Sequence, residues 1–363
     1  MTEVVSLEDI QNLNQIIKKQ KQKMVELRKL VKTLKFLPVD PVGNYSCISY
    51  KAIDGGKMRI EFDPFEMDLI DIADSNGREI LKFVTPKGTI GGKLTPNDFL
   101  FLDEIPQIQK FVTILDVASV ANISRILSES RTAMEIAEYA CIFERITADF
   151  VDPTLIMKDG LLRTKVIKVE LISRLVEKLR ENKEMKLVGV SKTSRLLSMI
   201  SSALFIEKIF PPDGVGYVEV PSKLELMAYK WSGHGIINEE ERLDYAFGKL
   251  YVAKLSSHSN LLVTVEIPYD LEHNTPIYNR QEVNEIFGHL IKDAMYSYPN
   301  LGYPQTIMRA HEKAVQIGFT ASIIKDKIMD ILIDGADKPL SDYIRDLMLL
   351  KEIVDKGVLG GGM

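Results

Sequence analysis

Cysteine is scarce in this 363-residue sequence, which contains only Cys47 and Cys141. Both stand among apolar neighbours, and neither has the spacing to another cysteine or a histidine that a zinc site requires. This scarcity argues against a disulfide framework and against a cysteine-based metal site. We therefore expect two buried thiols in a reducing cytoplasm.

Long apolar runs are also missing, because no stretch of about 18 or more consecutive apolar residues occurs. The first residues, Met-Thr-Glu-Val-Val-Ser, lack the basic start and apolar stretch of a signal peptide. We therefore expect no membrane-spanning helix and no signal peptide, and we expect a cytoplasmic protein.

Net charge is small as well, and the value of −5 gives little sign of a polyanionic partner. The basic residues are unevenly distributed, however, since eight of them lie between Lys18 and Lys35 against the single acidic residue Glu26. Apolar residues recur there at spacings of three, four and seven, which predicts an amphipathic helix from Leu7 to Leu37 within residues 1–40. Two roles for this helix remain open: packing or dimerisation, and contact with a nucleic-acid backbone.

The order of the remaining predicted elements indicates the fold class. Three strand-like runs come first, followed by a helix, a strand, a helix, a strand and a helix. This is the order of the ribonuclease H-like α/β fold, in which an antiparallel meander is extended by right-handed parallel crossovers into a mixed sheet flanked by helices. The predicted elements of this core, about residues 45–210, are strands at 47–53, 67–73, 79–84, 154–158 and 186–190, and helices at 105–131 in broken form, 131–147, 168–181 and from Thr193 or Ser194 through Leu204.

Further elements follow the core inside a predicted domain of residues 41–335. A β-rich extension covers about 211–270, helices cover about 280–320, and residues 336–363 form a C-terminal helix and flexible tail. The extension is predicted to contain strands at 215–220, 224–231, 245–255 and 261–268.

Two aspartates share one local pattern. Asp54 and Asp159 each end an apolar strand-like run and are followed by glycine. Asp-Gly is a common β-turn pair, so a plain turn is one interpretation. The other is a carboxylate ligand for a divalent cation, with Gly55 and Gly56 leaving room for a phosphate backbone. The fold order favours the second, because this fold carries its acidic ligands on its first strand, its first helix and the end of its fourth strand.

The helix between the two aspartates supplies the third acid. Glu135 is the preferred candidate, although an ion pair with Arg131 would explain it equally well. Glu138 and Glu144 lie on the same helix, and the choice among the three glutamates remains open. Two divalent cations held by such carboxylates can activate water for phosphodiester hydrolysis.

Two further residues have less specific surroundings. Lys192 follows a short strand at a strand-to-helix junction, where it can bind phosphate or stabilise transition-state charge, or remain a solvated lysine. His311 lies on a helix that begins near Pro304, and a lone helical histidine is more often structural than a metal ligand. Trp231 and the tyrosines are too scattered to predict a platform for base stacking.

Five of these motifs together resemble the NurA family, prokaryotic nucleases that act with the hexameric DNA translocase HerA. The motifs occur in the family order over about residues 45–320. They are Ile53-Asp54-Gly55, Met134-Glu135, Lys158-Asp159-Gly160, Gly189-Val190-Ser191-Lys192, and Gly302-Tyr303-Pro304 through Ala310-His311. One departure is Gly56, where the family often has serine.

The resemblance implies a manganese-dependent DNA nuclease, with single-strand endonuclease and 5′–3′ exonuclease activity, in DNA end resection and double-strand break repair. It also implies a homodimer that docks on a HerA-type ATPase, and a site of two Mn²⁺ ions, with Mg²⁺ as an alternative metal. Asp54, Glu135, Asp159 and His311 are then the expected metal ligands, with Lys192 as a further catalytic residue. Two alternatives stay open: a catalytically silent subunit that binds nucleic acid or a translocase, and a ribonuclease H-like enzyme acting on RNA or a hybrid.

Overall fold

A computed structural model of the chain describes residues 7–40, 49–62, 65–89, 130–147, 152–164, 169–192, 195–232, 236 and 238–318, with a few single positions up to 346. The chain divides into two compact units, which we describe separately. Unit 1 comprises Met1–Asp54, Asp74–Asn76 and Cys141–Ala310, and unit 2 comprises Gly55–Ala73, Gly77–Ala140 and His311–Met363. Several expectations lie outside the described residues: Cys47, residues 105–129 of the helix expected at 105–131, the caps Thr193 and Ser194, and most of the C-terminal segment.

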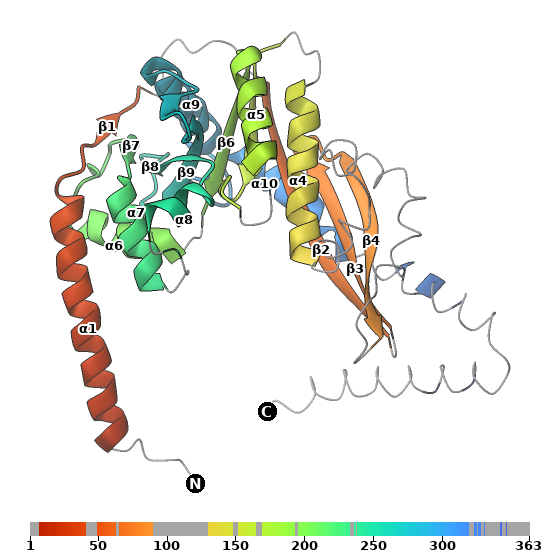
Figure 1. The fold of residues 1–363 in the computed structure, drawn as a ribbon, viewed down its shortest axis with the longest axis horizontal. Helices are drawn as coiled ribbons and strands as arrows, with labels where there is room; N and C mark the ends of the chain where they lie inside the picture. The colour runs from red at the N-terminus through yellow and green to blue at the C-terminus, as the bar shows by residue number, and fades with distance from the viewer. Residues whose placement is uncertain are drawn as a thin grey trace. The chain divides into compact units, whose positions relative to one another are not determined.

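Unit 1 contains a mixed sheet in the order β1-β7-β8-β9-β6-β5-β2 (Figure 1). The pairs β2–β5 and β5–β6 are parallel, whereas β6–β9, β8–β9, β7–β8 and β1–β7 are antiparallel. The strands are β1 (Leu37–Pro38), β2 (Ser49–Phe62, here up to Asp54), β5 (Thr154–Asp159), β6 (Met185–Ser191), β7 (Gly216–Glu219), β8 (Gly248–Lys254), β9 (Leu262–Asp270) and β10 (Thr275–Pro276), which pairs with β9.

Helices cover both faces of this sheet. The alternation of side chains along β8 explains the two layers, because Tyr251 and Ala253 face one core and Leu250 and Val252 face the other. The first core includes α9 (Arg280–Ala294) and α10 (Gln305–Val315, here up to Ala310), and the second includes α1 (Leu7–Val31), α6 (Arg195–Ile206) and α7 (Ser222–Ser232). The other helices of unit 1 are α5 (Val169–Glu181), α8 (Glu239–Leu243) and the end of α4 (Ser130–Thr147).

Unit 2 contains the rest of β2 followed by β3 (Phe65–Asp74) and β4 (Glu79–Thr89), in the order β2-β3-β4. The two glycines of β2 are required by packing here. A Cβ atom on Gly56 would lie 2.0 Å from the carbonyl oxygen of Ala314, and one on Gly55 would lie 2.6 Å from Cγ of Met134. These contacts, within the protein, explain both glycines without an approaching phosphate backbone.

An acidic residue is buried on β3 of unit 2. Asp71 is only 3% exposed and pairs across the strands with Lys82, whose Nζ atom is 3.9 Å away. Burial and the nearby charge of Glu79 raise the pKa of Asp71 to about 6, although Lys82 acts in the opposite direction.

The predicted mixed α/β sheet is confirmed, with the antiparallel β3–β4 pair and the parallel strands β2, β5 and β6 in the expected order. One strand prediction is wrong, because Leu224–Trp231 lies in the helix α7. Pro221 precedes this helix, and Leu224, Ala228 and Tyr229 recur at helical spacing to fill the core against α6.

Two element boundaries also differ from the prediction. The N-terminal helix ends at Val31 rather than at Leu37, and Leu37 instead pairs with Tyr217 in the sheet. The run ending at Asp54 is the first half of a longer strand, because β2 continues through both glycines to Phe62. Cys141 is buried as expected. Among the helices that the structure describes, none combines the length and apolar character needed to cross a membrane.

Candidate metal centre

Asp159 is placed by the turn that ends β5. Gly160 has a φ of +95°, a conformation that glycine adopts readily, and its N–H donates to the carbonyl oxygen of Val190 at 2.8 Å. The chain therefore turns sharply after Asp159, and this carboxylate lies at the edge of the sheet where the parallel strands end. The Asp-Gly turn and the ligand interpretation are thus compatible.

Asp54 reaches the same edge through the parallel pairing of β2 with β5. Ile53 is paired with Lys158, so that the next residue on each strand is an aspartate. Asp54 is 6% exposed and Asp159 is partly buried. Strand register alone therefore brings together two carboxylates that are far apart along the chain.

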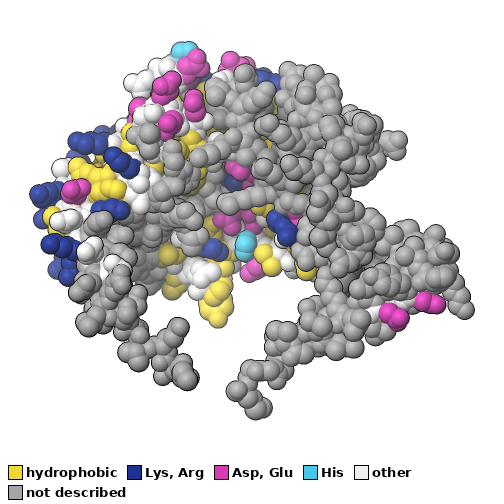
Figure 2. Space-filling view, turned by 60° about the horizontal axis from the view of Figure 1, so that its bottom comes forward, with side chains coloured by type: hydrophobic (Ala, Val, Ile, Leu, Met, Phe, Trp, Pro, Cys, Tyr) yellow, Lys and Arg dark blue, Asp and Glu magenta, His cyan; other side chains and the backbone are white. Residues whose placement is uncertain are grey.

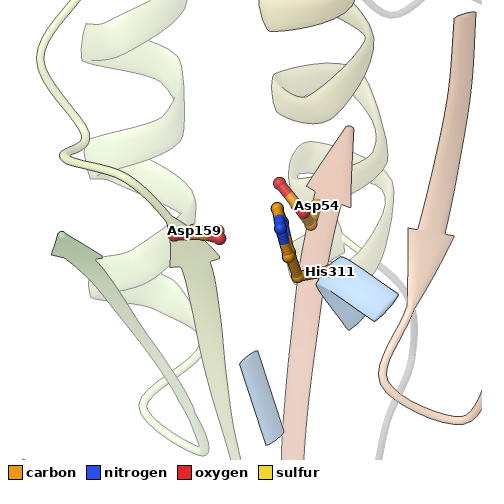
Figure 3. Close-up of side chains that lie close together, drawn as sticks. All are labelled: Asp54, Asp159 and His311. Carbon is orange, nitrogen blue, oxygen red and sulfur yellow. The ribbon is translucent and has the colours of Figure 1, made fainter. Parts of the chain in front are cut away.

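His311 completes a group of three possible ligands. It lies on α10, and one ligand atom from each of Asp54, Asp159 and His311 lies within 4.8 Å of the others. Figure 3 shows the side chains of Asp54 and His311 next to each other, with the Asp159 side chain directed toward them from the end of β5. His311 is exposed, and near its centre Figure 2 shows a histidine side chain close to acidic and basic side chains.

Tyr303 supports Asp159 and was assigned no role from the sequence. Its hydroxyl donates to Oδ1 of Asp159 at 2.6 Å and also lies 3.2 Å from the carbonyl oxygen of Val190. Burial raises the pKa of Tyr303 well above its usual value, and the charges of Asp159 and Asp54 add to this effect. The phenol therefore stays protonated, and it donates a hydrogen bond to the carboxylate of Asp159. The Gly302-Tyr303-Pro304 motif was the only sequence signal of this residue.

Lys192 is close to the same tyrosine. It is exposed after the end of β6, and its Nζ atom lies 5.3 Å from the centroid of the Tyr303 ring. A cation at this distance from an aromatic face is attracted by it. Lys192 therefore lies beside the tyrosine whose hydroxyl contacts Asp159.

The structure distinguishes the three glutamates of α4. Glu135 is half-buried and is not part of the group of three ligands, and Glu144 is also half-buried. Glu138 is 3% exposed, and its Oε1 atom lies 2.7 Å from the point where a Cβ atom on Gly55 would stand. Since Gly55 follows Asp54 directly, Glu138 is the glutamate whose carboxylate faces this part of β2.

The donor set is chemically suited to a divalent cation. Two carboxylates and one imidazole are ligands that Mn²⁺ and Mg²⁺ sites use, with oxygen as the preferred donor atom. Carboxylate oxygens this close repel each other when both groups are ionised, and a bound cation would offset that repulsion. The residues therefore fit a metal ion.

The segment behind Asp159 is anchored by a buried set of charges. Arg163 is 5% exposed, and its side chain donates to both oxygens of Glu266 at 3.1 and 3.0 Å and also contacts Glu225. The hydroxyl of Tyr229 is a further partner. Burial opposes the charge of Arg163, but Glu266 and Glu225 outweigh it and hold its pKa well above the usual value.

Comparison with known proteins adds a structural likeness. No protein-family model matches the chain, and no curated protein matches it. The chain is similar to crystal structures of NurA nucleases. The NurA nuclease from Sulfolobus solfataricus is 13% identical at a TM-score of 0.47, with 92% of this chain and 99% of that chain covered.

Two other structures of this kind give similar values. A NurA structure with manganese is 9% identical at a TM-score of 0.44, with 91% of this chain and 100% of that chain covered. A NurA structure bound to dAMP and manganese is 10% identical at a TM-score of 0.42, with 85% and 93% covered. All three TM-scores lie below 0.5, so the functional argument rests on the side chains of this chain.

Proposed function

We propose that this chain is a metal-dependent deoxyribonuclease that hydrolyses phosphodiester bonds at the centre formed by Asp54, Asp159 and His311. The observation that carries the proposal is the convergence of these three side chains, within 4.8 Å, from two parallel strands and a late helix. Asp54, Asp159 and His311 belong to three of the five ordered motifs that resemble the NurA family.

The side chains have distinct roles in this proposal. Asp54 and Asp159 hold the metal through oxygen atoms, His311 provides a nitrogen ligand, and Glu138 replaces Glu135 as the preferred helix carboxylate. A pair of divalent ions held by these side chains would activate a water molecule and stabilise the leaving oxygen. Lys192 offers an exposed positive charge to the phosphate of the substrate.

Finer features of the proposal are those that the resemblance to the NurA family implies. We include single-strand endonuclease and 5′–3′ exonuclease activity, Mn²⁺ with Mg²⁺ as the alternative, and a homodimer that acts with a HerA-type ATPase in DNA end resection and repair. The basic helix α1 is a candidate for dimerisation or DNA contact.

A digestion experiment tests the proposal. End-labelled single-stranded DNA and matched RNA are incubated with the protein in Mn²⁺, Mg²⁺ or chelator, with and without a HerA-type ATPase. We expect metal-dependent cleavage of DNA, about 10²- to 10³-fold slower in Asp54→Asn and Asp159→Asn, because each substitution removes a charged ligand.

The matched control is Asp152→Asn, since Asp152 is an exposed aspartate that precedes the other end of β5. This variant should cleave like the wild type. Cleavage that survives both ligand substitutions would contradict the proposal. Metal binding without any cleavage would favour a silent subunit, and cleavage of RNA alone would favour a ribonuclease.

A further inference from the structure

The loop between α9 and α10 exposes two aromatic side chains. Tyr296 is 75% exposed and Tyr298 is 84% exposed, the highest values among the large hydrophobic side chains that the structure describes. Tyrosines packed in the core of unit 1, such as Tyr217 and Tyr303, are only 2% and 1% exposed. Exposed aromatic side chains in one short loop are typical of a binding surface.

The backbone of this loop is held by hydrogen bonds within unit 1. The hydroxyl of Ser297 donates toward the carbonyl oxygens of Ala294 and Asn300, at 3.0 and 2.8 Å. The N–H of Gly302 also donates to the carbonyl oxygen of Ala294, at 3.0 Å. The two tyrosines therefore stand on a fixed backbone, which lowers the entropy lost when a ligand binds.

The connection between β8 and β9 packs against the α9–α10 loop, and this contact locates the α9–α10 loop in unit 1. The hydroxyl of Ser256 donates to the carbonyl oxygen of Met295 at 3.0 Å, and the ring of His258 lies 5.7 Å from that of Tyr296. Ser256 and His258 belong to the connection between β8 and β9. This connection lies at the start of β9, whose residue Thr264 is paired with Ser191 at the end of β6.

That end of β6 is also the edge of the sheet where Asp159 lies. Asp159 is paired with Val190, one residue before Ser191. The loop itself leads directly into Tyr303, whose hydroxyl contacts Asp159. Two independent observations thus place the loop with Tyr296 and Tyr298 on the same edge of unit 1 as Asp159. One is the register of β9, β6 and β5, and the other is the hydrogen bond from Tyr303, at the end of this loop, to Asp159.

We propose that Tyr296 and Tyr298 form a stacking platform for the bases of single-stranded DNA on its way to the metal centre. The proposal rests on the nuclease function proposed above. An aromatic ring stacks on any of the four bases, so that such a platform holds a strand without selecting its sequence. Single-stranded DNA is the occupant because its bases can unstack at low cost and stack on a tyrosine ring. The bases of a duplex are already stacked and paired with each other. The exposed Lys292, one helical turn before Tyr296, adds a positive charge for the backbone.

Binding without cleavage provides the test. The affinity of a labelled single-stranded oligonucleotide is measured by fluorescence anisotropy in chelator, for wild type, Tyr296→Ala, Tyr298→Ala and the double variant. A second oligonucleotide has the same backbone charge but contains abasic sites. The control variant is Phe205→Ala, because Phe205 is 67% exposed in the last turn of α6, about 15 Å along that helix from its first residue, Arg195.

The expected result has two parts. Each single variant should bind the intact strand from about 5-fold to about 150-fold more weakly than the wild type, the range for stacking one base on an aromatic ring. The abasic strand should bind the wild type and the double variant with similar affinity, because it has no base to stack. Replacement of both tyrosines by leucine should behave like alanine, and Phe205→Ala should change nothing.

The outcomes separate this inference from the proposed function. Equal binding of the intact strand by the wild type and the double variant, with cleavage by the wild type in Mn²⁺, overturns the platform and leaves the nuclease. Base-dependent binding lost in the double variant, without cleavage, supports the platform and overturns the nuclease. If the wild type binds no single-stranded DNA, the platform is overturned. It is also overturned if the two tyrosines are found to bind a partner protein and not DNA.

Discussion

Tyr303→Phe is the substitution that tests the support of the metal centre most directly. It removes one oxygen atom from a ring that is 1% exposed and leaves the packing of the ring in place. The lost oxygen is the donor to Oδ1 of Asp159 at 2.6 Å. Without this donor, Asp159 would be held less firmly in the orientation that faces Asp54 and His311.

The magnitude follows from the type of hydrogen bond. A bond to a charged acceptor contributes about 1.5–3 kcal/mol, which corresponds to a factor of about 10 to 150 in an equilibrium constant. Partners that orient metal ligands contribute a similar factor of about 10–100 in metal affinity. We therefore expect Tyr303→Phe to bind Mn²⁺ about 10- to 100-fold more weakly, with cleavage largely restored at saturating Mn²⁺.

Calorimetric titration with Mn²⁺ measures the affinity, and the dependence of cleavage rate on Mn²⁺ concentration measures the recovery. The control is Tyr278→Phe, because Tyr278 is 5% exposed and its hydroxyl also makes a buried hydrogen bond, from the N–H of Leu187 at 3.0 Å. This control should lower the free energy of unfolding and leave Mn²⁺ affinity unchanged.

Two results would refute the reasoning. If Tyr303→Phe bound Mn²⁺ as tightly as the wild type, the hydrogen bond would have no part in holding the ligand. If both tyrosine variants lost Mn²⁺ affinity equally, the effect would come from general destabilisation of unit 1.

Three further predictions concern other parts of the chain. Glu138→Gln should reduce cleavage about 10- to 100-fold while Glu135→Gln has a much smaller effect, and equal effects in the digestion assay would contradict the choice of Glu138. Gly56→Ala should lower the free energy of unfolding in urea by about 1–3 kcal/mol or more, whereas Gly318→Ala, whose Cβ atom would have only an ordinary contact at 3.5 Å, should be nearly neutral. The raised pKa of Asp71 means that the folded state holds this proton more tightly than the unfolded state, so its ionisation lowers stability as pH rises from about 4 to about 6. Asp71→Asn should therefore gain about 1–3 kcal/mol relative to wild type at pH 7 and almost nothing at pH 4 in urea unfolding, and a gain independent of pH would contradict this assignment.

The order of the core elements was predictable because apolar periodicity separates helices from strands. Buried runs such as Leu155–Met157 and Leu187–Val188 are short and continuous, and the stripe of α5 has the spacing of a helix. The segment 224–231 was misassigned because a short run of apolar and polar residues fits both periods. Only the packing of Leu224 and Ala228 in one core decides between them.

The candidate site was predictable only in part. Asp54 and Asp159 each stand before glycine, but Asp213 and Asp334 do so as well, so the order of the elements was also needed to select them. Glu138 could not be chosen over Glu135, because the rotation of α4 about its axis depends on which residues pack against β2. The role of Tyr303 depends on a contact across 144 positions of the chain, which no local pattern reveals.

The buried charges around Arg163 have a consequence for how this protein can change over evolution. Loss of Arg163 alone would leave Glu225 and Glu266 without their main counter-charge, and loss of either glutamate would remove a counter-charge of Arg163. Removing one partner of such a set is destabilising by about 3–5 kcal/mol, whereas replacing the whole set with apolar residues of similar volume is often neutral. Intermediate sequences should therefore be rare, and among homologous chains these three positions should be charged together or apolar together.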